Sequence, residues 1–326
     1  MTDDLDVAIN DLYPVPEGGI KSLRRVRARV VPQPRRLLRW PYSAAAAVVL
    51  AVAVIVVVVR GGAPDGAMVE VAQTLNTAAD AQIRTVDEPV PAGKYRYIAT
   101  HAMDTGWGPA PTLFGSRVET WVPADPSGVW FRRVGDTGER IPLTGSTAAG
   151  GPGVTDERLS GPCGRFRPGE GDGDMCLSEG SWQVPTAVFI AGLPRDPEHL
   201  FDRLRSDTDG HGSDGDQEVL VYAADALRSG LLPADLRAAI YRALTRLSAL
   251  KITERAATLD GHTGTALGVT GAGQRQEIVI DPETGVFIGE RKRLSEETEG
   301  VKAGTMVGSS TVIYGIADEP WQRPAN

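Results

Sequence analysis

The densest group of residues that could do chemistry is an acidic loop in the second half of the chain. The stretch DTDGHGSDGDQE fits the twelve-residue frame of a calcium-binding loop, with Asp207, Asp209 and Glu218 at positions 1, 3 and 12. Carboxylate oxygens are the ligands that Ca²⁺ prefers. His211 at position 5 is a poor oxygen ligand, however, and Asp- and Gly-rich connectors fit this frame by chance. The loop is therefore either a calcium site or a solvated connector.

The other reactive residues show no catalytic arrangement. His101, His199, His211 and His262 are scattered and lack the spacing of metal ligands. We find no nucleophile elbow, no P-loop and no glycine-rich dinucleotide turn between a strand and a helix. The sequence therefore predicts no catalytic residues, no cofactor and no enzymatic activity.

Cys163 and Cys176 are the only cysteines, and they bracket the loop GRFRPGEGDGDM. In an oxidising compartment such a pair is typical of a disulfide. A zinc site would need four ligands, and no second pair is present. We expect a disulfide that closes a loop and does no chemistry.

The strongest signal in the sequence concerns location. Ala44 to Val59 are sixteen consecutive apolar residues, a length typical of a membrane span or a buried helix. A cleaved signal peptide fits poorly, because about forty residues precede the run and no good cleavage site follows it. Eight basic residues precede the run, which predicts a cytoplasmic N-terminus. They are Lys21, Arg24, Arg25, Arg27, Arg29, Arg35, Arg36 and Arg39.

This orientation divides the chain into four parts. We expect a largely disordered cytoplasmic tail (1–42), a single transmembrane helix (43–60), a linker (61–66) and an extracytoplasmic domain (67–326) in the cell envelope. The tail is too short and too polar to bury a core. Residues 61–326 carry 25 of the 34 basic residues and 37 of the 42 acidic ones, a balance that argues against a nucleic-acid partner.

Hydrophobic periodicity predicts an α+β domain: an antiparallel sheet, possibly curled, with a helical insertion. A helix is expected at 67–85, a strand at 95–99 and two further strands around the turn at 123–128. Residues 144–180 are rich in Gly, Pro and acids and predict an irregular excursion. Three helices then follow at about 196–204, 218–228 and 233–247, before four strands within 251–294 and one at 307–314.

Three strings occur in the order VETWVPADPSGVWFRR, LPADLRAAIYRALTRL and EIVIDPETGVFIGER. With the basic stretch and the Ala/Val span, they resemble a family of uncharacterised single-pass membrane proteins of high-GC Gram-positive bacteria. These proteins are commonly encoded beside extracytoplasmic-function sigma factors. The resemblance implies membrane-linked regulation with a sigma factor or an envelope protein as partner. The zinc-binding pattern of anti-sigma factors is absent from residues 1–42.

The order of elements also resembles the lipoprotein-carrier half-barrel, in which a sheet curls around helices. That resemblance implies a lipid or a partner peptide as ligand. Two hypotheses follow. One is a regulatory membrane protein with an external binding domain; the other is an anchored lipid- or lipoprotein-binding module without a signalling role.

The half-barrel hypothesis predicts an apolar pocket between the strands and the helical block. An ordinary closed core formed by the same residues is the alternative. The candidate residues are Tyr95, Tyr97, Trp121, Trp130, Leu236, Ile240, Leu244 and Phe287.

The predicted topology is tested by accessibility. In intact spheroplasts, external protease should digest residues 67–326 and leave residues 1–42 protected, because the basic residues hold the N-terminus inside. A reporter fused after Asn326 should be active only outside the cytoplasm; activity inside would refute the orientation.

Overall fold

The computed structural model describes residues 66–85, 87–145, 155–166, 175–212 and 214–324. They form an α+β fold with one open antiparallel sheet, which confirms the predicted fold class. The strands are β1 (Tyr95–Gly106), β2 (Thr112–Pro123), β3 (Val129–Pro142), β4 (Glu157–Pro162), β5 (Lys251–Leu259), β6 (His262–Gly271), β7 (Gln274–Ile280), β8 (Phe287–Leu294) and β9 (Met306–Ala317). The helices are α3 (Gly66–Arg84), α4 (Ala187–Gly192), α5 (Pro197–Thr208), α6 (Gly215–Arg228) and α7 (Ala234–Leu244), with a short 3₁₀ turn η2 (Met175–Leu177).

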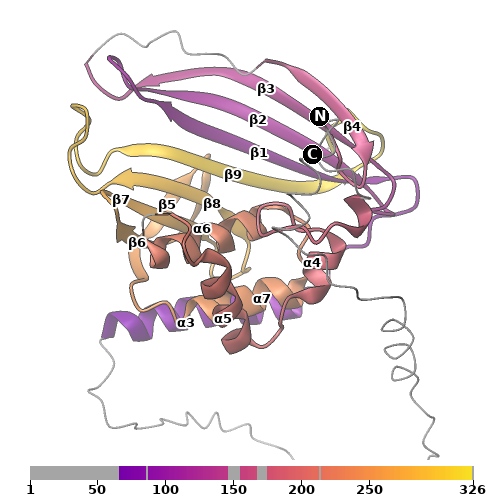
Figure 1. Cartoon of the computed structure of the whole chain (residues 1–326), viewed down its shortest axis with the longest axis horizontal. Coiled ribbons are helices and arrows are strands. Elements are labelled where there is room, and N and C mark those ends of the chain that lie inside the picture. Colours follow the sequence, from indigo (N-terminus) through magenta and orange to yellow (C-terminus); the bar gives the residue numbers. More distant parts are fainter. Residues whose placement is uncertain (1–65, 86, 146–154, 167–174, 213, 325–326) are drawn as a thin grey trace, which may run out of the picture. The chain divides into compact units, whose positions relative to one another are not determined.

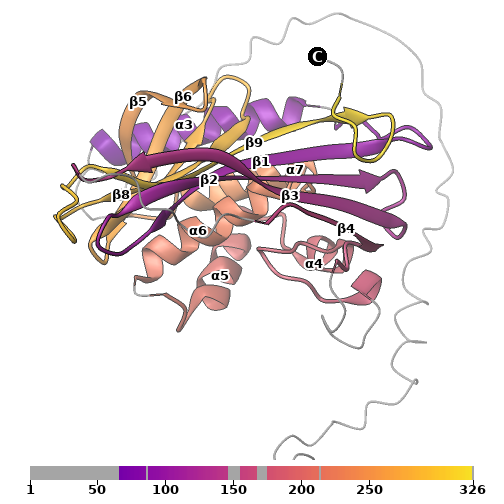
Figure 2. The same ribbon diagram turned by 90° about the horizontal axis from the view of Figure 1, so that it is seen from above.

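The sheet joins two meanders of the chain. Its strand order is β4-β3-β2-β1-β9-β8-β7-β6-β5, so every neighbouring pair but one is consecutive in the sequence. The exception is β1 with β9, which pair antiparallel from Tyr95 opposite Ala317 to Asp104 opposite Gly308. Figure 1 shows the helices gathered below the sheet, and Figure 2 gives the view from above.

The helical block begins where its capping residues predict. Asp196 accepts hydrogen bonds from two backbone N–H groups at the start of α5, and Pro197 occupies the first turn. Asp214 caps α6 in the same way, so this helix begins at Gly215, three residues before the expected start. The cap explains the difference, because an N-terminal Asp satisfies amide groups that apolar periodicity does not register.

One large core lies between the helices and the face of the sheet that they cover, here called the helix-side face. Ile98, Leu267 and Ile278 from the strands pack with Leu236 and Ile240 of α7. The turn between β7 and β8 contacts both α3 and α7. Gln82 of α3 donates to the Thr284 carbonyl oxygen, and Tyr241 of α7 donates to that of Gly285. Figure 1 shows α3 and α7 side by side beneath the sheet.

A second, smaller cluster covers the opposite face, here called the outer face. Tyr97 and Trp121 pack there with Trp321 of the C-terminal segment. Tyr97 and Arg323 both donate to buried Glu119, each at 2.6 Å. Burial raises the pKa of Glu119, but the two hydrogen bonds outweigh it and the pKa is lowered overall.

The disulfide between Cys163 and Cys176 is present, as predicted, with the two Cα atoms 5.3 Å apart. The excursion expected at 144–180 is less irregular than predicted, because β4 lies within it and pairs with β3. β4 has few apolar residues, so its sequence alone gives little strand signal.

The predicted membrane-spanning helix (43–60) and cytoplasmic tail (1–42) lie outside the described residues. So does the linker expected at 61–66, apart from Gly66, which is the first residue of α3. None of the helices in the described ranges combines the length and apolarity that a membrane crossing requires.

Gly285 provides a sharp test of the core. Its φ is +72°, and a Cβ there would lie 2.4 Å from the Ala78 carbonyl oxygen of α3. Gly285→Ala in the 62–326 fragment should lower the free energy of unfolding by the cost of positive φ, about 1–2 kcal/mol, plus a backbone clash. Gly261→Ala is the control, because Gly261 has φ +81° and open space around its Cβ position. Urea unfolding should show the larger loss for Gly285→Ala; equal losses would contradict the tight contact.

Candidate functional site

A cleft of about 710 Å³ opens between the helix-side face of β1–β3, the segment containing α4, and the C-terminal end of α6. Its surface is mainly apolar. The apolar lining includes Ile98, Val118, Trp130, Phe166, Ile190 and Leu231. A concave site with apolar walls and a few polar groups is typical of small-molecule binding.

Strand alternation forms one wall of the cleft. Ile98 and Thr100 of β1 lie opposite Thr120 and Val118 of β2, and all four line the cleft. Trp130 of β3 lies beside them. Its indole N–H donates to the Pro126 carbonyl oxygen at 2.7 Å, which fixes the ring. The wall is therefore built on hydrogen-bonded strands.

The opposite wall is the segment around α4. Thr186 caps α4 by accepting from the backbone N–H of Phe189, and its hydroxyl donates to the Ser178 carbonyl oxygen at 2.8 Å. Phe189 points inward and makes an edge contact with buried Trp182. These contacts hold Ile190 against the cleft.

The disulfide lies at the border of the cleft. Cys163 and Cys176 both line it, and the sulfur of Cys163 is 3.3 Å from the Ser127 carbonyl oxygen. Gly164, next to the disulfide, has φ +81°, and its Cβ position lies against the Trp130 ring. The disulfide therefore supports the wall that carries Trp130.

Charged side chains also line the cleft: Asp125, Arg132, Arg195, Asp225 and Arg228, of which the last two form its charged end at α6. Arg228 of α6 bridges two carboxylates, Asp225 on its own helix and Glu290 on β8, and only the first of these lines the cleft. Ser310 and Gln276 also donate to Glu290, at 3.1 and 2.8 Å. Burial raises the pKa of both carboxyl groups, although Arg228 opposes the shift. One cation shared by two buried acids leaves this end polar but poorly solvated.

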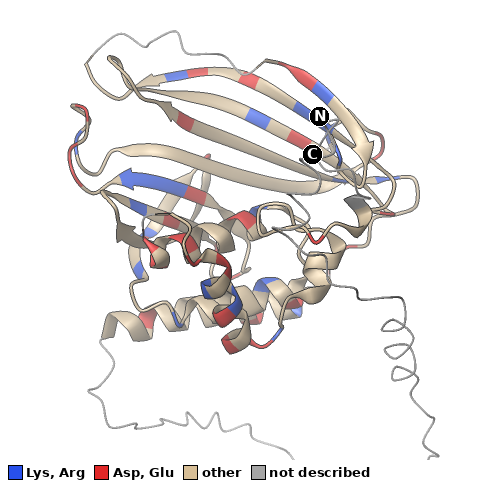
Figure 3. Cartoon of the chain, viewed as in Figure 1, with Lys and Arg blue, Asp and Glu red and all other residues tan. Residues whose placement is uncertain are grey.

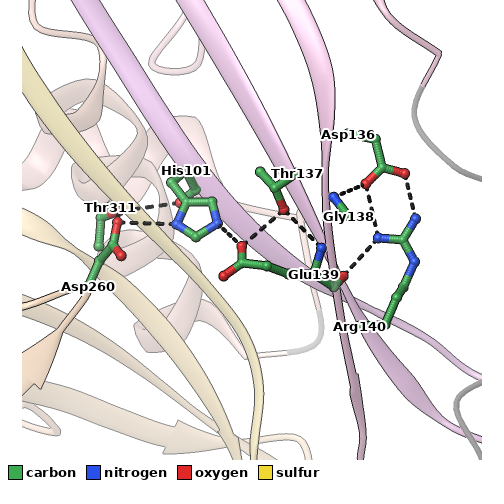
Figure 4. A network of polar contacts seen from close by, with 8 residues as sticks. All are labelled: His101, Asp136, Thr137, Gly138, Glu139, Arg140, Asp260 and Thr311. Atoms are coloured by element: carbon green, nitrogen blue, oxygen red, sulfur yellow. Dashed lines mark hydrogen bonds and ion pairs between the residues drawn. The ribbon is translucent and has the colours of Figure 1, made fainter.

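A second polar network lies on the outer face and is drawn in Figure 4. His101 contacts Glu139 through Nε2 at 2.6 Å and Asp260 through Nδ1 at 3.1 Å. Thr311 also donates to Asp260, at 3.0 Å. Both imidazole nitrogens contact carboxylates, so the network ties the β5–β6 turn to β1 and β3.

The residues predicted to form one pocket do not meet in one place. Trp130 lines the cleft. The three other aromatic candidates from β1 and β2, Tyr95, Tyr97 and Trp121, belong to the outer-face cluster. These residues therefore lie on both faces of the sheet, because successive strand residues point to opposite faces.

The remaining pocket candidates are core residues. Leu236, Ile240, Leu244 and Phe287 are buried among the helices and the helix-side face and do not line the cleft. For them the alternative interpretation, a closed core, describes their surroundings. The cleft lies on the β1–β3 side of the same face.

The calcium frame is not assembled. Asp207 accepts from Trp182 at 2.8 Å and from Arg203 at 2.6 Å, while Asp209 ends α5 and Glu218 lies in the first turn of α6. Within the described ranges, no group of three or more His, Cys, Asp or Glu side chains is placed to hold a metal ion. Asp207 instead fixes Trp182 beneath α4.

Sequence reasoning missed most of the cleft. Phe166 follows the first cysteine in a loop, and Ile190 lies in a helix of only six residues, too short for periodicity to detect. Asp225 and Arg228 stand three apart on α6 and carried a visible signal, because that spacing pairs opposite charges on a helix. Their second partner, Glu290, comes from a distant strand.

Comparison with known proteins gives little. No protein-family model matches the sequence, and no curated protein matches it. Among solved structures, a DUF1329 family protein from Desulfovibrio piger aligns over 78% of this chain and 95% of its own, with 11% identity and a TM-score of 0.21. A likeness at that score supports no argument about fold or function.

The charged end of the cleft generates a pH prediction. A carboxyl whose folded pKa is raised favours the folded state most below its unfolded pKa, and this contribution is lost as the pH rises toward the folded pKa. The stability advantage of the native chain over Glu290→Gln should therefore shrink as the pH rises from about 4 to 7, by about 1.4 kcal/mol per unit of pKa difference.

Glu119→Gln is the opposite-sign control, measured by urea unfolding with the range extended down to about pH 3, because a lowered folded pKa acts below the ordinary glutamate value. Because the folded pKa of Glu119 is lowered, the native chain should gain on this variant as the pH rises. Two parallel curves would contradict the assignment.

Proposed function

We propose that the described domain is a binding module for an elongated apolar ligand such as an acyl chain, held in the cleft between β1–β3 and α4. The main support for this proposal is the cleft itself. Its volume of about 710 Å³ is within the range of about 300–1,000 Å³ that ligand sites occupy, and its walls are mainly apolar. Each buried methylene group would contribute about 0.8 kcal/mol to binding.

The walls are preorganised for such a ligand. Trp130 is fixed by its hydrogen bond, and Ile190 by the capped and buttressed α4. A site whose residues are already held in place loses less conformational entropy on binding. The resemblance of the element order to the lipoprotein-carrier half-barrel favours the same class of ligand.

The charged end orients the ligand. Asp225 and Arg228 line the cleft together with Gln183, which also hydrogen-bonds Asp225. An acyl chain would lie along the apolar strand wall, with its polar group toward these three side chains. A few convergent polar groups in an apolar cleft commonly fix a ligand's direction.

In the cell, we expect this module to be anchored by the apolar run at 44–59, outside the cytoplasm. A regulatory link to a sigma factor is suggested by the sequence resemblance alone. Capture of partners by residues 1–42 tests that link separately from ligand binding.

The cleft is tested with a fluorescent sixteen-carbon fatty acid and the 62–326 fragment. Ile190→Asn places an amide against the chain, so the Kd should rise at least about tenfold. Ile313→Asn is the control. Ile313 is 46% exposed and does not line the cleft, so the same chemical change there should leave the Kd unaltered.

Native mass spectrometry of the full chain purified from membranes should also show a bound lipid that Ile190→Asn removes. No saturable binding by the native fragment, or equal binding by both variants, would exclude this ligand class. Circular dichroism melting checks that Ile190→Asn remains folded.

A further inference from the structure

The segment that forms the α4 wall of the cleft also presents apolar side chains to solvent. Leu177 is 73% exposed, Val184 57% and Val188 43%. The 3₁₀ turn that ends at Leu177 contacts α4, and the Thr186–Ser178 hydrogen bond joins the two. We call Leu177, Val184 and Val188 the apolar lip.

Two of the three lip residues, Val184 and Val188, lie in a stretch of the chain without charged residues, whereas the exposed Glu179 follows Leu177 two residues later. Residues 180–194 contain no charged residue, and Figure 3 shows α4 without blue or red while the other helices carry both signs. Exposed apolar residues are common singly, but a group of them beside a cleft is typical of an interaction site.

The lip continues into the cleft. Val184 is both exposed and part of the cleft lining, and Pro185, Ala187 and Ile190 follow it along the same wall. An apolar ligand could move from the lip to Trp130 without leaving apolar surface. A continuous apolar path suits a lipid bilayer, which can supply apolar ligands to the cleft, better than a soluble partner with a polar surface.

The chain itself brings a bilayer close. The apolar run that predicts a membrane span ends at Val59, and only six residues separate it from α3. Six extended residues reach at most about 20 Å. If the run spans a bilayer, a connection of this length keeps the start of the domain within about that distance of the membrane.

The lip is supported from behind by packed aromatic rings, a hydrogen bond and the disulfide. Phe189 and Trp182 pack edge to face beneath it, and Asp207 accepts the indole N–H of Trp182. The Cys163–Cys176 disulfide ties the chain next to Leu177 to the end of β4. The side chains of the lip are thus held outward by an anchored segment.

We propose that the apolar lip is a membrane-docking surface. It inserts into the headgroup region of the outer leaflet and lets an apolar ligand pass between the bilayer and the cleft. The transfer of a ligand rests on the proposed function of the cleft as a ligand site. The docking of the lip to the membrane does not require a ligand in the cleft. Interfacial segments of this kind bury apolar side chains about 5–10 Å into the headgroup region.

The test is flotation of the 62–326 fragment with vesicles, which removes the predicted span from the measurement. The fragment contains every core cluster found in the described residues, so it carries its own fold. It should float with neutral phosphatidylcholine vesicles, and added anionic lipid should change the bound fraction little, because the lip is uncharged.

Leu177→Ser/Val188→Ser should lower the partition coefficient at least about tenfold. Neither residue lines the cleft, so loading of the fluorescent fatty acid from solution should stay unchanged. The matched control is Ile141→Ser/Val286→Ser, which removes apolar residues of 49% and 46% exposure elsewhere and should float like the native fragment.

Equal flotation of both double variants, or no flotation of the native fragment, would overturn the proposal. A concentration-dependent dimer that is lost in Leu177→Ser/Val188→Ser and does not float would assign the lip to a second copy instead. Failure of fatty-acid loading with flotation intact would count against the cleft and not against the lip.

Discussion

The pairing of β1 with β9 holds the architecture together. It joins a meander that ends at β4 with one that begins at β5, and it brings Tyr95 and Ala317 opposite each other across more than two hundred residues of chain. Without it, each meander would have an unpaired strand edge, and the helices would have no continuous face to cover. The cleft depends on this pairing too, since its strand wall comes from the first meander and its charged end from α6, which packs on the second.

Local features of the sequence predicted the elements well, because each has a physical signature of its own. The strands within 251–294 are separated by turns at Asp260–Gly261 and Asp281–Gly285, and α5 begins at Pro197 behind its Asp cap. Strand β4 and helix α4 were missed for the opposite reason. Both have only six residues, too few to show a period.

Register is what the sequence could not settle. Trp121 and Trp130 flank the same hairpin, but Trp121 pairs with Phe131. That shift of one residue places Trp121 on the outer face, where Trp321 covers it, and Trp130 in the cleft. The coverage depends on a C-terminal segment about two hundred residues away, so no local pattern contains it.

The C-terminal segment has a consequence for the order in which the domain can be completed. Trp321 and Arg323 pack against the first meander, where they contact Trp121, Phe131 and Glu119. The strands of this meander are synthesised long before the two residues that cover them. A chain that is made from its N-terminus must hold these strands with one edge of β1 unpaired, and with their outer aromatic residues uncovered, until its last residues arrive. Such long-range closure folds slowly and exposes a strand edge meanwhile. While the chain is being made, the first meander would therefore be the part of this domain that most needs a chaperone.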